Sequence, residues 1–181
     1  MQRLHWLSVP MLVTTSICAH ATQYATPDVA AKRSFPEATA FKEMIVQLSA
    51  AEMRAIADAA GLPVRNSAWR VTVALNGDKP MGVMVQDSVI GKFELIDYAV
   101  AIGNDGKICN VEILSYRESH GYEVRLPVWR KQFIGKGPDA KLRVSEDIAN
   151  ISGATMSSTN VTDGVRRAVA VVARMRAAGK L

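Results

Sequence analysis

Apolar and polar residues alternate along four segments in the middle of the chain. The alternation, with many β-branched side chains, predicts strands at residues 68–75, 81–86, 96–102 and 108–114. Asn76-Gly77-Asp78 and Asn104-Asp105-Gly106 fall between them and are typical of tight turns. Strands that follow one another through short turns pair with their neighbours, so the pattern predicts an antiparallel meander.

A second pattern, with apolar residues three or four positions apart, predicts helices on both sides of the strands. Ser34 to Glu37 resembles a capping box and predicts a helix of about ten residues, with apolar side chains on one side at Phe41, Met44, Ile45 and Leu48. Ser49 to Glu52 is a second capping box, and Gly61 ends the helix that it opens. A short helix is expected over residues 126–133. The last helix has its apolar side at Val161, Val165, Ala168, Val169, Val172 and Met175.

These elements predict an α+β fold, with N-terminal helices, an antiparallel β-sheet meander, and C-terminal helices packed on the sheet. Residues 1–21 have the pattern of a secretory signal peptide: Arg3, an apolar stretch, and Ala19-His20-Ala21 as a small-x-small cleavage site. Residues 22–33 are polar and small and are expected to form a flexible leader. Residues 34–178 are then a single domain, exported to the periplasm or otherwise outside the cytoplasm.

Export would leave Cys109 and His120 as the mature chain's cysteine and histidine. A lone cysteine excludes an internal disulfide and a CxxC redox pair, and a lone histidine excludes the common zinc sites. Cys109 is expected to be a buried apolar residue. The formal net charge is +5 without a basic run, so no nucleic-acid partner is expected. No metal site and no catalytic residue is assigned, and redox work would require a bound organic cofactor.

The stretch from Ser152 to Ser158 combines glycine, small residues and hydroxyls directly before the last helix. A helix N-terminus presents unpaired N–H groups and the positive end of the helix dipole, so it can bind an anion. Gly153 and Ala154 would let the backbone approach a ligand closely. The ordinary alternative is a capped helix, since serine and threonine are preferred N-caps.

Ser152-Gly153-Ala154-Thr155 followed by Ser157-Ser158 resembles the attachment motif of the FMN-binding domain. That domain occurs in subunits of the sodium-translocating NADH:quinone reductase and of Rnf-type electron-transport complexes. The resemblance implies FMN as the cofactor, joined by a phosphodiester to Thr155. It also implies a flavin transferase that attaches FMN, and a redox protein or membrane electron-transport complex as partner.

A second stretch resembles the same family: Glu118 and Gly121 in a loop after the last strand, then Trp129, Gln132, Phe133, Gly135 and Lys136. On this resemblance Tyr122, Trp129 or Phe133 would line the flavin ring. Its polar edge would meet Glu118, His120 or Gln132. The aromatic side chains could equally belong to the hydrophobic core.

The chain departs from the family motif at Ala149, where the common form has an aspartate six residues before the threonine. Asp147 is the nearest acid. The expected function is an exported FMN-binding electron-transfer protein, a redox carrier rather than a self-contained enzyme. Two alternatives stay open: an exported FMN-dependent reductase of a small acceptor, and a cofactor-free binding or regulatory module on the same fold.

Overall fold

A computed structural model of the protein describes residues 22–118 and 120–181. Its centre is a six-stranded antiparallel sheet with the strand order β1-β6-β5-β4-β3-β2. The strands are β1 (Thr22–Gln23), β2 (Ala40–Gln47), β3 (Ala68–Asn76), β4 (Lys79–Ile90), β5 (Leu95–Gly103) and β6 (Ile108–Tyr116). The helices are α1 (Pro27–Ser34), α2 (Ala50–Ala60), α3 (Pro127–Arg130) and α4 (Thr155–Ala177), with 3-10 turns η1 (Tyr122–Arg125) and η2 (Lys131–Phe133).

Strands β3 to β6 form the meander that the alternating pattern predicts. Asn76 pairs with Lys79 across the first turn, and Gly77 there has a φ of 57°, a left-handed conformation that glycine adopts at little cost. The predicted α+β fold, with helices before the sheet and a C-terminal helix packed on it, is therefore confirmed.

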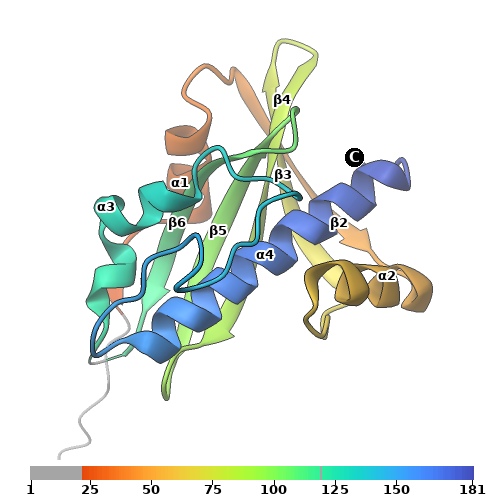
Figure 1. Ribbon diagram of the computed structural model, residues 1–181. Coiled ribbons are helices and arrows are strands. Elements are labelled where there is room, and N and C mark those ends of the chain that lie inside the picture. The colour runs from red at the N-terminus through yellow and green to blue at the C-terminus, as the bar shows by residue number, and fades with distance from the viewer. Residues whose placement is uncertain (1–21, 119) are drawn as a thin grey trace, which may run out of the picture.

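The sheet separates two hydrophobic clusters. Helix α4 lies across one face with α2 beside it (Figure 1), and it covers Val85, Val100 and Ile102 among other buried residues of the strands. Alternate strand residues point to the opposite face, where Met84 and Ala101 pack against α1. The predicted apolar stripe of the last helix, from Val161 to Met175, is buried as expected.

A buried polar network fixes α4 against the sheet. The Tyr98 hydroxyl donates to Asp87 at 2.9 Å, and the Arg167 guanidinium pairs with the same carboxylate at 2.6 Å. Gly164 of α4 sits directly over Tyr98, because a Cβ on this glycine would lie 2.2 Å from the hydroxyl oxygen. Burial, followed by the charge of Asp87, raises the pKa of Tyr98 well above its ordinary value, so the phenol stays protonated and donates.

Two predictions for the N-terminal part were wrong. Residues 40–47 form β2 rather than a helix, paired along their whole length with β3. The expected capping box fails because Ser34 ends α1, where its hydroxyl donates to the Ala30 carbonyl at 2.7 Å. Residues 22–33 are not a flexible leader either, since they supply β1 and most of α1.

The prediction for Cys109 was also wrong: its side chain is exposed. Ile108 faces the core of the sheet, so the alternation of a strand turns the next residue outward. The signal-peptide segment lies outside the described residues. Within the described ranges, no helix has the length and apolar character that crossing a bilayer requires.

Candidate functional site

Helix α4 begins at Thr155, whose side chain is exposed. The N-cap residue is Ala154, which has no side-chain oxygen to cap the helix. No acceptor within residues 22–118 and 120–181 pairs with the backbone amides of Thr155, Met156 and Ser157. The helix therefore presents free N–H donors and a hydroxyl at its positive end.

A tight turn leads into this helix. The amide of Ala154 donates to the Ile151 carbonyl at 3.0 Å, and Gly153 has a φ of 79°. Ser152 and Gly153 are exposed, and a Cβ on Gly153 would meet no atom within 4 Å. The turn thus leaves open space beside the motif.

The two serines of the motif face inward. Ser158 is fully buried, and its hydroxyl lies 3.0 Å from both the Thr155 carbonyl and the Asn150 Oδ1. Ser157 is almost fully buried and hydrogen-bonds the Tyr116 side chain. Both hydroxyls hold the start of α4 in place rather than pointing into solvent.

Asn150 is a residue of this site that the sequence interpretation missed. Its Nδ2 lies 3.2 Å from the Thr155 hydroxyl oxygen, and its Oδ1 accepts from the Ile151 amide at 2.8 Å. Asparagine before a helix is a common turn residue, so the sequence carries no signal for a contact with a side chain five positions away.

The second predicted stretch meets the motif at Gly121. A Cβ on Gly121 would lie 2.6 Å from the Ala154 Cβ and 3.4 Å from the Ser157 Oγ, and the φ of Gly121 is 80°. The Tyr116 hydroxyl donates to the carbonyl of His120 and so fixes this loop. Glycine at 121 lets the loop pass close to the helix start, and the structure brings the two resembling segments together.

Glu118 is bound by the turn between β4 and β5. Its carboxylate accepts from the amides of Phe93 at 2.5 Å and Glu94 at 3.0 Å. Desolvation alone would raise its pKa, but these backbone hydrogen bonds outweigh it and lower the pKa of Glu118. His120 is exposed, and Tyr122 is 52% exposed with the Arg125 guanidinium 5.5 Å from its ring.

Trp129 and Phe133 lie in the hydrophobic core. Trp129 is 6% exposed and Phe133 is 0% exposed, and their rings make an edge-to-face contact with centroids 5.2 Å apart. The Trp129 indole N–H donates to the Ala149 carbonyl at 2.9 Å, and the Gln132 Oε1 accepts from the Ala149 amide at 2.7 Å. The sequence left two roles open for these rings, flavin contact and core packing, and in the structure both rings are packed in the core.

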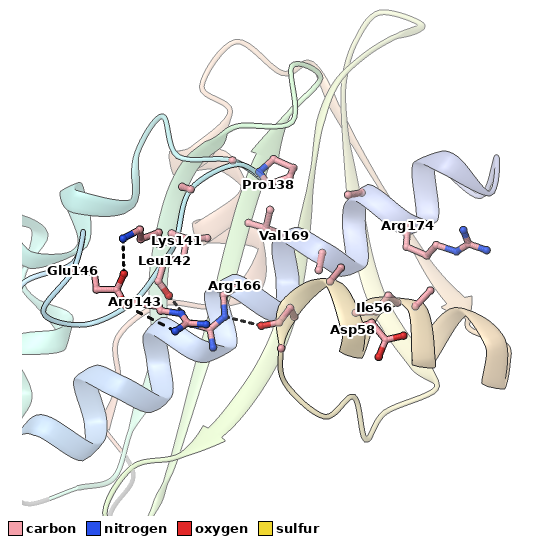
Figure 2. Close-up of a pocket in the computed structure, with 18 residues that line it drawn as sticks. Ile56, Asp58, Pro138, Lys141, Leu142, Arg143, Glu146, Arg166, Val169 and Arg174 are labelled. Atoms are coloured by element: carbon pink, nitrogen blue, oxygen red, sulfur yellow. Dashed lines mark hydrogen bonds and ion pairs between the residues drawn. The ribbon is translucent and has the colours of Figure 1, made fainter.

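Two grooves follow α4 from the motif. The first, of about 460 Å³, opens beside Thr155 and Asn150 and includes Arg143 and Arg166. The second, of about 710 Å³, lies farther along α4 and shares both arginines (Figure 2). The Arg166 guanidinium donates to the Ala60 carbonyl at 2.8 Å and to the Leu142 carbonyl at 2.7 Å, so it joins the loop at Leu142 to α2.

Residues 91–170 match the family model of the FMN-binding domain. The chain carries an FMN-binding domain. The matched segment contains both resembling stretches, from the Glu118 loop to the helix after Thr155. The crystal structure of Shewanella oneidensis NqrC is similar in fold, with 21% sequence identity and a TM-score of 0.54, and the match covers 81% of this chain and 88% of that chain. The comparison with curated proteins found no significant match.

The residues at the start of α4 fit the phosphate of FMN. A phosphate needs hydrogen-bond donors, positive potential and room, and the domain offers free amides, a helix N-terminus and the open side of Gly153. Arg143 and Arg166 line the adjoining groove, where they pair with Glu146 at 3.8 Å and Asp163 at 2.9 Å, so their charges are offset. The exposed hydroxyl of Thr155 is an acceptor that a phosphodiester requires.

Proposed function

We propose that this chain is an exported electron-transfer protein that holds FMN through a phosphodiester to Thr155. The observation that supports it most directly is the exposed Thr155 hydroxyl at the first position of α4, inside a segment that matches the FMN-binding domain. In the same motif, Ser157 and Ser158 are buried and already hydrogen-bonded. Among the hydroxyls in the first turn of α4, Thr155 is thus the exposed one.

The backbone amides of residues 155–157 would hold the phosphate oxygens, and the α4 dipole would stabilise the remaining negative charge. Gly121 and Ala154 keep the helix start and the Glu118 loop in contact. Bound FMN can accept and release electrons singly or in pairs, which suits a carrier between unlike redox partners. The chain's task is then to fix, orient and partly shield it.

Tyr122, His120 and Met156 are exposed side chains near the motif, and we expect them to border the flavin ring. Trp129 and Gln132 would support the site indirectly, because their polar atoms hold the Ala149 peptide group. Glu118 would likewise act by ordering the turn at Phe93 and Glu94.

The proposal of export rests on the signal-peptide pattern of residues 1–21. An exported chain must receive and retain its FMN outside the cytoplasm. A covalent bond serves this need, because a dissociated cofactor would be lost there. The partners are a flavin transferase and a redox protein or membrane electron-transport complex.

The test is co-expression of the full chain with a flavin transferase, followed by intact mass and by in-gel fluorescence of the denatured protein. We expect a chain that begins at Thr22 and carries one FMN less one water. Thr155→Val should abolish the fluorescence, while Ser152→Ala should retain it at a lower level, because Ser152 lies beside the site without supplying the acceptor. Fluorescence that survives Thr155→Val would refute the attachment site, and FMN bound only in the native state would refute the covalent bond.

A further inference from the structure

Asn150 connects the segment before α4 to the acceptor hydroxyl. Its Oδ1 accepts from the Ile151 amide at 2.8 Å and lies 3.0 Å from the Ser158 hydroxyl. Its Nδ2 lies 3.2 Å from the Thr155 Oγ1.

The partners of Asn150 determine which way its amide group faces. The Ile151 amide can only donate, so the atom next to it must be the oxygen, and the nitrogen must face Thr155. An amide nitrogen donates and does not accept. The Thr155 oxygen therefore receives this hydrogen bond, and its own proton points elsewhere.

The position of Asn150 is fixed by its neighbours. The peptide group of Ala149 is held on both sides, by the Trp129 indole N–H and by the Gln132 carbonyl oxygen. Ser158, on the other side, is fully buried. Asn150 is thus held between a clamped peptide group and a buried hydroxyl, which makes it a rigid support for an exposed threonine side chain.

We propose that Asn150 is a positioning residue for the flavinylation of Thr155, an inference that rests on the proposed function. The donor must carry FMN in a phosphoanhydride, as FAD does, because a simple phosphate ester lacks a good leaving group. The Thr155 oxygen bonds to the phosphorus on the riboflavin side, the phosphoanhydride P–O bond breaks, AMP leaves, and the hydroxyl proton passes to the transferase or to water. Asn150 donates to one lone pair of the threonine oxygen and holds this oxygen so that its other lone pair and its proton are both available for this step.

The test is the rate at which purified flavin transferase and FAD load the full chain, read as fluorescence after denaturation. Asn150→Asp keeps an acceptor for Ile151 and Ser158, but at neutral pH its carboxylate cannot donate to Thr155. We expect loading to slow about tenfold, the effect of one lost hydrogen bond. As the pH falls the carboxyl group gains a proton and can donate again, so the ratio of variant to unaltered rate should rise toward one. A purely structural role would not produce this recovery.

Asn160→Asp is the matched control, because Asn160 of α4 also donates from Nδ2, to the carbonyls of Ile90 at 2.7 Å and Gly91 at 3.1 Å, without contact to Thr155. It should load at the unaltered rate. Asn150→Ala, which lacks both the donor and the added charge, should be slow at every pH. Loading of Asn150→Asp and Asn150→Ala at the unaltered rate, when Thr155→Val abolishes it, overturns this assignment alone. An unaltered chain that takes no covalent flavin overturns the proposed function and this assignment together.

Discussion

The indole N–H of Trp129 donates to the carbonyl of Ala149 across 2.9 Å, and so joins the short α3 helix to the segment that leads into α4. Gln132 completes the contact by accepting from the amide of the same residue. These two side chains, which the sequence suggested for the flavin ring, hold the backbone six residues before Thr155.

The first prediction concerns this clamp. Gln132→Ala removes the acceptor for the Ala149 amide, so this amide should exchange with solvent deuterium about tenfold faster, as expected for one lost hydrogen bond. Gln132→Glu keeps an acceptor oxygen and is the matched control, which should retain protection. The measurement is hydrogen exchange of peptides that span residues 143–155. Equal exchange in all three proteins would mean that the clamp does not order this segment.

The second prediction concerns Gly121, where backbone and contact both require glycine. Alanine there would adopt a left-handed φ of 80° at a cost of about 1–2 kcal/mol, and its Cβ would overlap Ala154 at 2.6 Å for about 1–3 kcal/mol more. Gly106→Ala isolates the backbone part, because Gly106 has a φ of 81° and open space around it. Urea unfolding should therefore show the larger loss for Gly121→Ala.

The loss at Gly121 should also reach the site, since the added methyl pushes against the residue before Thr155. Covalent flavin loading should fall in Gly121→Ala and stay unchanged in Gly106→Ala. Equal destabilisation by the two variants would show that the loop yields at no cost and that the close approach to Ala154 is not needed.

The sequence predicted what depends on local pattern, and it failed where distant contacts decide. The capping box at Ser49 and the αL glycine at Gly61 appear in the structure as predicted, because both are made within one helix. Residues 40–47 have apolar side chains at helical spacing, yet they form an edge strand, since pairing with β3 satisfies their backbone and neither face is strongly buried. Thr26 and Pro27 were an available signal for α1, as N-cap and first-turn residues, within a segment whose composition suggested a leader.

The candidate site shows the same division. The exposed position of Thr155 at a helix start follows from the motif and the periodicity after it. The hold of Trp129 and Gln132 on Ala149 depends on how segments far apart in sequence fold together. The contact of Asn150 with Thr155, five positions away, depends on the turn between them, and no residue pattern encodes either contact.

The third prediction concerns the pH dependence of stability that arises from the ion pair between Glu52 of α2 and Lys180 near the C-terminus. The Lys180 ammonium donates to Glu52 at 2.7 Å, and this bond, with the Ser49 amide next, lowers the pKa of Glu52 from 4.5 to about 2. A carboxyl group whose pKa is lower in the folded state stabilises the fold above its unfolded pKa, and that contribution is lost as the pH falls from 4.5 toward about 2.

Glu52→Gln keeps the cap on Ser49 and removes the charge, so its melting temperature should lie below that of the unaltered protein at neutral pH. The gap should close as the pH approaches 2. Lys180→Met removes the cationic partner of Glu52 and should abolish the same pH dependence of the melting temperature. A gap that stays constant over this range would mean that the ion pair adds nothing to stability.

The last prediction concerns Ala149, where the common aspartate is missing. Its side chain is exposed, while its amide and carbonyl are held by Gln132 and Trp129, so Ala149→Asp adds a carboxylate without breaking the clamp. Asp147 cannot take the missing role, because its carboxylate accepts from the amides of Leu142 at 3.1 Å and Arg143 at 2.8 Å and pairs with Lys136 at 3.4 Å.

If the transferase uses a carboxylate at position 149 to hold a metal ion or the acceptor hydroxyl, Ala149→Asp should load flavin faster than the unaltered chain, with an unchanged melting temperature. Ala149→Asn, of equal size but uncharged, should load at the unaltered rate. Equal loading rates for all three proteins would show that the transferase itself supplies the charge.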